Sequence, residues 1–297
     1  MSDETRIAVL ADVHGNLPAL EAALDDIAEQ DVTGIVSNGD MVNRGPQNDE
    51  VLELLAAAGA EMLLGNHDDL LRMWARRDSA LPSSWFGHPF WEGTAWCARQ
   101  LERSGWLGAL EGLPLTKRVE EPGAQRLLIA HGSPRHYREG YRESLPGPVI
   151  SELGEEYGAE VLVGSHTHIP LRREQGDVLL LNTGAVGTPF NRDPRAHYLL
   201  LTLEDGIWRP ELRRVAYDRE RTFAAFEETG YLREGGLSAR IFLTELQVAR
   251  SLFTPFLAWA EAGEGPLDEE GWREFQRRYP ERFEPLPELT PGGRSPR

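Results

Sequence analysis

Short apolar segments alternate with segments of helical spacing at the start of the chain, and this alternation constrains the fold more than any other feature. Residues 6–11 are apolar enough for a buried strand, and residues 17–30 carry apolar side chains at helical spacing. The same pair follows at residues 32–37 and 49–58, and a short strand is predicted at residues 61–64. Strands that alternate with helices are typical of an α/β sheet whose functional loops lie at the carboxyl ends of the strands.

The pattern changes after residue 70. Residues 70–113 are rich in tryptophan and phenylalanine and are predicted to form a helical insertion, broken at Pro82 and Pro89, beside those loops. Strands then resume, and several are joined by turn residues, so the second half should contain more hairpins. They are predicted at residues 126–130, 161–163, 177–181, 198–203 and 208–215.

Helical segments dominate the C-terminal part of the chain. A helix is predicted at residues 218–228, and a long helix at residues 238–262 is interrupted around Pro255. The apolar content of the long helix favours core packing over a dimer interface or a cover on the functional loops. We therefore expect a main domain, a helical extension packed on it and a disordered tail, at residues 1–235, 236–284 and 285–297.

The charge balance limits the partners of the chain. Its 297 residues carry a formal net charge of −17, which argues against a protein that coats nucleic acid through a general positive field. Lys117 is the only lysine, so almost every basic residue is an arginine. Arginine is well shaped for bidentate phosphate contacts, although a bias in genome composition is the favoured explanation.

The chain shows no sign of export or membrane insertion. Cys97 is the only cysteine, so no intramolecular disulfide can form. The first residues have neither the charged start nor the apolar stretch of a secretion signal, and no later segment reaches membrane-spanning length. We expect a cytoplasmic protein.

Polar motifs follow the predicted strands directly. Five of the eight histidines lie in these motifs, and an aspartate or an asparagine accompanies several of them. Because parallel strands end at one edge of a sheet, all of these side chains should lie close together. The candidates are Asp12, His14, Asp40, Asn66, His67, His131, His166 and His168.

This mixture of ligands predicts a metal site. Carboxylate, imidazole and amide groups together suit Mn²⁺, Fe²⁺ or Zn²⁺ rather than Ca²⁺, which prefers oxygen ligands alone. The set is too large for one ion, so two ions bridged by a carboxylate would share it, as in two-metal phosphoryl-transfer sites. A metal site that serves structure without turnover is the alternative.

The motifs resemble those of calcineurin-like metallophosphoesterases. The matching residues are Asp12-x-His14, Gly39-Asp40, Gly65-Asn66-His67-Asp68, His131-Gly132 and His166-Thr167-His168, and the resemblance spans residues 6–215. The segment Leu181-Asn182-Thr183-Gly184-Ala185-Val186-Gly187, followed by Asp193-Pro194-Arg195-Ala196, is similar to the bacterial and archaeal phosphodiesterase branch of that family.

The resemblance implies a fold and a ligand assignment. The fold would be a four-layer α/β/β/α sandwich of two mixed sheets flanked by helices. Two divalent ions would bind, with Mn²⁺ expected and Fe, Zn, Ni or Co as alternatives. One ion would be held by Asp12, His14 and His168 and the other by Asn66, His131 and His166, with Asp40 as the bridge.

The resemblance also implies catalytic roles. A hydroxide shared by the two metals would attack phosphorus, and His67 would protonate the leaving group, a role worth about 10²- to 10⁴-fold in rate. Asp68 would orient the His67 imidazole, or would simply start a helix.

The chain departs from the family pattern at a few positions. Ser165 replaces the usual glycine before the paired histidines, and Thr183 and Ala185 replace the proline and serine of the Asn-Pro-Gly-Ser loop. Asn43 stands where the phosphoprotein phosphatases have an aspartate, which weakens that interpretation.

The substrate remains open at this level. We expect a metal-dependent phosphodiesterase, with some phosphomonoesterase activity, that acts on nucleotide-type substrates. A nuclease that uses the Trp-rich insertion for stacking, a phosphoprotein phosphatase and a metal-binding scaffold protein are the alternatives, and a homodimer through the C-terminal helix is conceivable. Candidate substrate contacts near the motifs are Arg44, Asn16, Arg135, His136 and Arg192, although each is also explained as a solvated side chain.

Overall fold

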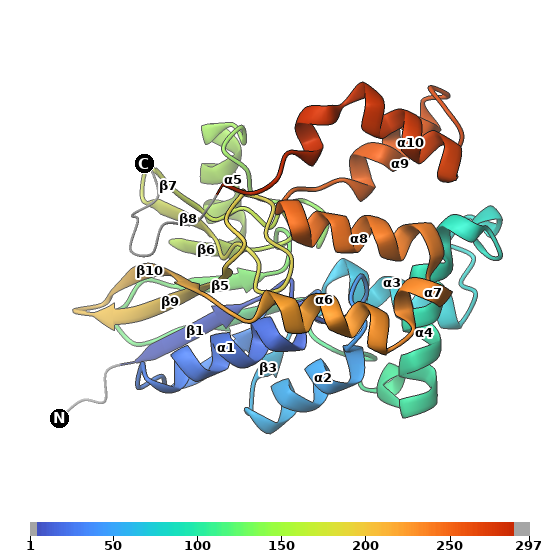
Figure 1. The fold of residues 1–297 in the computed structure, drawn as a ribbon. Coiled ribbons are helices and arrows are strands. Elements are labelled where there is room, and N and C mark those ends of the chain that lie inside the picture. Colours follow the sequence, from blue (N-terminus) through green and yellow to red (C-terminus); the bar gives the residue numbers. More distant parts are fainter. Residues whose placement is uncertain (1–4, 288–297) are drawn as a thin grey trace.

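Two five-stranded mixed sheets form the centre of the computed structural model, which describes residues 5–287 (Figure 1). The first sheet has the order β10-β9-β1-β2-β3, with β1 Arg6–Leu10, β2 Gly34–Ser37, β3 Glu61–Met62, β9 Ala196–Glu204 and β10 Ile207–Val215. The second has the order β4-β5-β6-β8-β7, with β4 Thr116–Val119, β5 Leu127–Ala130, β6 Val161–Gly164, β7 Leu171–Gln175 and β8 Val178–Asn182.

The pairing of the strands explains why both sheets are mixed. β1, β2 and β3 are parallel, as are β5, β6 and β8. Antiparallel strands complete each sheet. In the first sheet, β9 and β10 lie together at one edge, and in the second, β4 and β7 lie at opposite edges. The β9–β10 hairpin turns at Asp205 and Gly206, which both have positive φ, as the predicted turn required.

The two-residue period of β1 divides the core into layers. Ile7 and Val9 point between the sheets and pack with Ile129 and Val163 of the second sheet. Ala8 and Leu10 point the other way, into the cluster formed with α1 Leu17–Ala28 and α2 Asn48–Ala57. On the far side, α5 Gly147–Tyr157 covers the second sheet. The predicted four-layer α/β/β/α sandwich is therefore confirmed.

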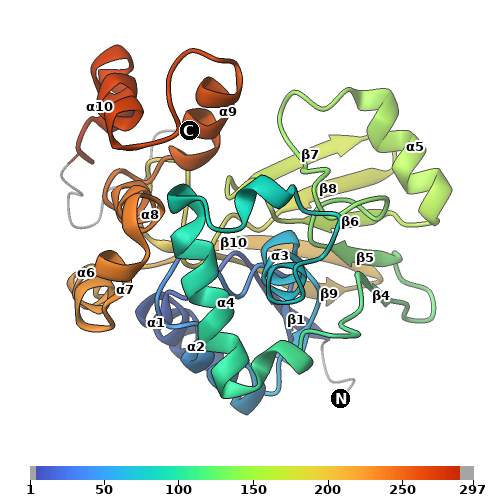
Figure 2. The ribbon, with the colours of Figure 1, turned by 90° about the vertical axis from the view of Figure 1, so that its right-hand side faces the viewer.

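The remaining helices gather beside the ends of the strands that carry the polar motifs (Figure 2). They are α3 Asn66–Ala75, α4 Glu92–Ser104, α6 Arg219–Glu228, α7 Tyr231–Glu234, α8 Gly236–Val248, α9 Phe253–Glu261 and α10 Glu269–Arg278. Short 3-10 turns at Ser83–Trp85, Pro89–Trp91, Trp106–Gly108 and Pro280–Phe283 connect several of them. The predicted insertion is helical, and its first helix starts at Asn66, inside a polar motif.

The predicted interruption of the helix at residues 238–262 is confirmed, but its predicted position around Pro255 is wrong. The chain forms α8 and α9, and the break lies at Ala249, which has a φ of 47°. Pro255 sits in the first turn of α9, where proline costs little because its missing N–H has no helical partner. Most apolar side chains of both helices pack in the core, as predicted.

The strands β4 and β7 and the helix α5 were not predicted. Both strands are short edge strands with charged residues, so they lack the apolar pattern of a buried strand. The predicted disordered tail falls outside the described residues from 288 onward. Within residues 5–287, no helix is both long enough and apolar enough to cross a membrane.

Candidate metal centre

The predicted ligands lie in tight loops with left-handed backbone conformations. Asp12, His14, Asp40, His166 and His168 have φ values of 54°, 50°, 53°, 63° and 59°. Residues other than glycine rarely adopt such values, and they gather at functional sites when they do. Here each conformation turns the chain sharply at the end of a strand, so that successive side chains project toward one point.

Two glycines allow the loops after β2 and β3 to cross in backbone contact. A Cβ atom at Gly65 would lie 2.1 Å from the backbone nitrogen of Asp40, and one at Gly39 would lie 2.6 Å from the backbone of Gly65. Only a residue without a side chain fits at either position. The crossing brings Asp40 and Asn66 to the same side of the site.

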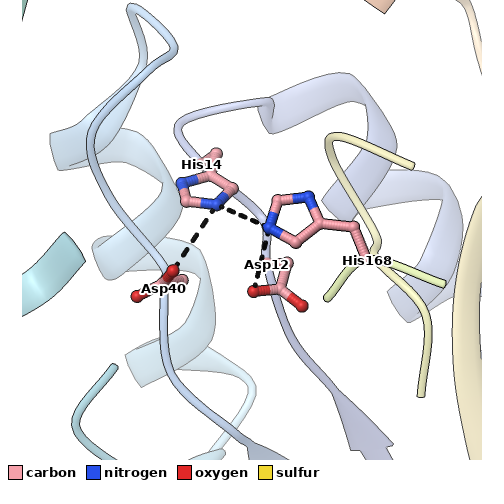
Figure 3. Close-up of side chains that lie close together, drawn as sticks. All are labelled: Asp12, His14, Asp40 and His168. Carbon is pink, nitrogen blue, oxygen red and sulfur yellow. Dashed lines mark hydrogen bonds and ion pairs between the residues drawn. The ribbon is translucent and has the colours of Figure 1, made fainter. Parts of the chain in front are cut away.

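A first group of side chains consists of Asp12, His14, Asp40 and His168, which point toward one another (Figure 3). Their ligand atoms all lie within 4.8 Å of one another, and all four residues are buried. The Nε2 atom of His168 is 3.3 Å from Nε2 of His14 and 3.4 Å from Oδ1 of Asp12. Oδ2 of Asp40 is 3.7 Å from Nε2 of His14.

A second group shares Asp40 with the first. It contains Asp40, His131 and His166, again with ligand atoms within 4.8 Å of one another. Nε2 of His131 is 3.3 Å from Oδ2 of Asp40 and 3.2 Å from the side-chain oxygen of Asn66. One carboxylate thus faces both groups, in the position that a bridge between two ions would need.

Three of the imidazoles are oriented from behind by backbone carbonyl groups. When the Nδ1–H group donates a hydrogen bond to a carbonyl oxygen, the lone pair of Nε2 is left to face the centre, as in most histidine ligands of metals. The pairs are His14 with Val42 at 3.2 Å, His131 with Asn38 at 2.8 Å and His168 with Thr188 at 2.6 Å.

The polar atoms at the centre fit a positively charged occupant. Oδ1 of Asp12 and Oδ2 of Asp40 are buried and accept no hydrogen bond from the described residues, and burial without a partner is costly. Burial raises the pKa of Asp12. Burial lowers the pKa of His131, and the nearby Asp40 and Asp12 carboxylates raise it, to about 10 in balance. The residues present therefore suit divalent cations.

His67 lies beside this centre rather than in it. Its backbone N–H donates to Oδ1 of Asp40 at 2.7 Å, and its ring is 4.9 Å from that of His14, edge to face. Nδ1 is 2.9 Å from the side-chain nitrogen of Asn43, and Nε2 accepts a long hydrogen bond of 3.4 Å from Nε of Arg44. Burial lowers the pKa of His67 to about 3.

The structure corrects the expected role of Asp68. Its carboxylate does not orient the His67 imidazole, which contacts Asn43 and Arg44 instead. It accepts hydrogen bonds from the backbone N–H groups of Gly65, Asp40 and Met41 at 2.9, 2.8 and 2.9 Å, with a longer one from Val42. Asp68 therefore ties the loop that carries Asp40 to the start of α3.

Comparison with known proteins identifies the family. The model of the calcineurin-like phosphoesterase family matches residues 5–170, which is more than half of the chain. The chain belongs to this family. The family uses divalent metals to hydrolyse phosphoric esters, so the chain is a metal-dependent phosphoesterase, and the groups of ligands described above form its candidate metal site.

Relatives of this phosphoesterase come from bacteria and archaea. An uncharacterized protein of Methanocaldococcus jannaschii is 28% identical over 74% of this chain and 91% of its own length. The phosphodiesterase YfcE of Escherichia coli is 25% identical over 66% of this chain and 86% of its own. A metallophosphoesterase of Sphaerobacter thermophilus has a similar structure, with a TM-score of 0.65 and 27% identity over 83% of this chain and all of that one.

The active site of the phosphoesterase opens into a cleft of about 1090 Å³. Asp40, Asn66, His67, His166 and His168 lie in its lining. One wall comes from the segment between β5 and α5, and another from the junction of α8 and α9 together with the turn Pro280–Phe283. The C-terminal extension thus forms part of the substrate cleft.

Of the predicted substrate contacts, only Arg44 lines this cleft. Its backbone is left-handed, with a φ of 68°, and its Nη1 donates to Oε2 of Glu245 at 2.9 Å. Its guanidinium group also lies over the rings of Phe190, Phe242 and Phe253, at 5.3 to 5.9 Å from their centres.

The other predicted contacts have structural partners elsewhere. Asn16 caps the start of α1, and its side chain also donates to the Gly187 carbonyl group. Arg135 pairs with acidic residues of α5, and His136 accepts from the backbone of its own loop. Arg192 donates to the backbone carbonyl groups of Val248, Glu284 and Pro285. The structure does not bring any of these four to the cleft.

Several residues at the site had not been predicted. Asn43 holds His67, and Glu245 holds Arg44, from a helix about 200 positions away in the sequence. Arg138, Arg142, Arg250 and Arg282 line the cleft. None of these arginines lies in a motif, so only their positions in space reveal them.

Proposed function

We propose that this phosphoesterase hydrolyses phosphodiester bonds in nucleotide-type substrates, with some activity on phosphomonoesters. The shared position of Asp40 between two groups of ligands supports a site with two ions, which suits in-line displacement at phosphorus. The similarity to a bacterial phosphodiesterase supports a diester substrate. The size of the cleft and its aromatic lining, which includes Trp85 and Phe190, support a substrate that carries a base.

The proposed ligand assignment follows the two groups. Asp12, His14 and His168 would hold one ion, Asn66, His131 and His166 the other, and Asp40 both. Divalent ions bound there, Mn²⁺ being our first choice, would supply Lewis acidity and activate water as the nucleophile.

The protein's own side chains would bind and protonate the substrate. Arg44 is fixed by Glu245 and faces the cleft, so it can bind a phosphoryl oxygen without losing much side-chain freedom. His67, held by Asn43, can deliver a proton to the leaving oxygen. The negative charge of a bound phosphate ester raises the pKa of the His67 imidazole and so favours its acidic form.

The nuclease alternative stays open. Trp74 and Trp96 of the insertion are buried in its core, but Trp85 and Trp91 line the cleft, where a base could stack.

A comparison of leaving groups tests the proposal. Metal-stripped protein reloaded with Mn²⁺ should hydrolyse both bis(p-nitrophenyl) phosphate and an unactivated dinucleotide. His67→Ala should lower kcat about 10²- to 10⁴-fold with the dinucleotide and less with the nitrophenyl ester, whose leaving group needs little protonation. No turnover of either ester by the wild-type protein would refute the function, and equal losses would refute the acid role of His67.

A further inference from the structure

The cleft contains arginines without acidic partners. The chain has 48 acidic and 31 basic residues, so most arginines have carboxylates within reach. Many do form ion pairs, for example Arg126 with Glu160 and Arg213 with Asp26. The side chains of Arg138, Arg142, Arg250 and Arg282, which all line the cleft, form no ion pair with a carboxylate of residues 5–287.

Two of these arginines lie on the wall that is formed by the segment connecting β5 and α5. Arg138 and Arg142 are exposed there, and both line the cleft together with His166. The wall therefore presents positive charge next to the second group of ligands.

The other two arginines lie on the wall formed by the C-terminal extension. Arg250 follows α8 and donates a hydrogen bond to the backbone carbonyl group of Glu281. This hydrogen bond joins the junction of α8 and α9 to the turn Pro280–Phe283. Arg282 is half-buried, and its Nε atom is shielded from solvent without a hydrogen-bond partner among the described residues. A shielded donor without a partner is stabilised when a ligand supplies a hydrogen-bond acceptor.

The charge of the cleft opposes that of the whole molecule. Three acidic residues, Asp40, Glu143 and Glu281, also line the cleft, and the five arginines of its lining, Arg44 included, outnumber them. A concave site with surplus arginine in an acidic protein attracts anions locally and can bind a phosphate group with paired hydrogen bonds.

Apolar side chains line the cleft together with the arginines and the metal ligands. Phe190 stacks on His168, with ring centres 4.3 Å apart, and Trp85 is half-buried against Trp91. Ile169 lines the same cleft and is 48% exposed. These surfaces suit a base or sugar placed between two anionic groups.

We propose that the walls of the cleft bind a second phosphate group, so that the preferred substrate is a nucleotide-type diester that carries a phosphate in addition to the scissile one. This inference rests on the proposed function, because it specifies the substrate class of the same site.

Dinucleotides that differ in one phosphate test the proposal. Thymidylyl-thymidine and its 5′- and 3′-phosphorylated forms contain the same scissile bond. At about 0.15 M salt, the wild-type protein should hydrolyse at least one phosphorylated form with a kcat/KM at least tenfold higher, mainly through KM. Equal kcat/KM values for all three dinucleotides would overturn the proposal.

Variants identify the residues responsible. Arg138→Gln/Arg142→Gln and Arg250→Gln/Arg282→Gln each remove two charges from one wall, and at least one pair should abolish the preference while turnover of bis(p-nitrophenyl) phosphate persists. Arg221→Gln/Arg233→Gln, which removes two exposed charges outside the cleft, is the matched control. A preference that survives in both cleft variants would overturn the proposal.

Binding separates this inference from the proposed function. If the wild-type protein cleaves no dinucleotide, the proposed function fails, and calorimetry then decides the second phosphate site. Thymidine 3′,5′-bisphosphate should bind the Mn²⁺-loaded protein at least tenfold more tightly than either monophosphate, and a cleft variant should lose that difference. Equal affinities would overturn the inference.

Discussion

Five of the seven expected ligands have left-handed backbones, and each such residue costs about 1–3 kcal/mol when it is not glycine. Hydrogen bonds between loops hold these conformations in place. The backbone N–H groups of Asp12 and His14 donate to the carbonyl groups of Gly39 and Asp40, each at 3.1 Å. Asp68 adds its bonds to the same loop. The ligands are therefore positioned by the loops themselves.

Replacing Asp68 tests this account at a single residue. Asp68→Asn keeps the shape of the side chain but exchanges one acceptor oxygen for a donor that faces backbone N–H groups. We expect the free energy of unfolding to fall by about 2–3 kcal/mol, because buried N–H groups lose their partner. Urea denaturation of the metal-stripped protein measures this loss without any contribution from bound ions.

The same chemical change at an exposed site is the control. Asp205→Asn lies in the β9–β10 turn, where asparagine also tolerates a positive φ, and should change stability little. If both variants were equally stable, the hydrogen bonds of Asp68 would not be what holds the loop.

Among the helices, α8 connects the rest of the C-terminal extension to the loop after β2, which carries Arg44. Glu245 is buried in this helix, and its Oε1 accepts the backbone N–H groups of Leu252 and Phe253 at 2.6 and 2.8 Å. Its other oxygen binds Arg44. One carboxylate thus binds the start of α9 and fixes an arginine of the cleft, so the extension supports a residue of the candidate site.

Removing this carboxylate should affect both stability and catalysis. Glu245→Gln leaves the buried Arg44 without its counter-ion, which costs about 3 kcal/mol in similar buried pairs. We also expect a higher KM, because Arg44 loses its fixed position in the cleft. Denaturation and steady-state kinetics on the same preparation measure the two effects.

A helical glutamate outside the core provides the comparison. Glu274→Gln changes an exposed residue of α10 and should leave both measurements unchanged. Loss of stability in Glu245→Gln with an unaltered KM would mean that Arg44 does not contact the substrate.

At the scale of the whole molecule, the buried carboxylates link metal binding to folding. Asp12 and Asp40 have oxygens without partners among the described residues, so ions that bind only the folded state stabilise it. At a free Mn²⁺ concentration of about 100 times Kd, the gain is about 2.7 kcal/mol per site. We expect chelation to lower Tm by about 5–10 °C and added Mn²⁺ to restore it.

Calorimetry of the chelated and reloaded protein provides this measurement. Mg²⁺ should restore less than Mn²⁺, because imidazole ligands suit the latter better. A Tm that does not respond to chelation, in a preparation whose metal content falls, would contradict the proposed ligand set.

The strand and helix patterns of the sequence predicted an α/β sheet with polar residues at its edge, and the resemblance to a known family supplied the four-layer sandwich. Alternating strand and helix patterns place Asp12, Asp40 and Asn66 after parallel strands, and strand ends meet at one edge whatever the details of packing. The sequence was not sufficient to place the break at Ala249, because a buried Glu245 that binds the start of the next helix overrides local helical spacing.

Only the tertiary structure decided what surrounds the metal ligands. Asp68 was expected either to orient His67 or to start a helix, and the start of α3 turns its carboxylate toward the loop after β2. Arg142 and Arg282 face one cleft although 140 positions separate them. Ligand motifs are local and repeat the order of the strands, whereas the walls of the cleft come from distant segments whose approach depends on how the whole chain packs.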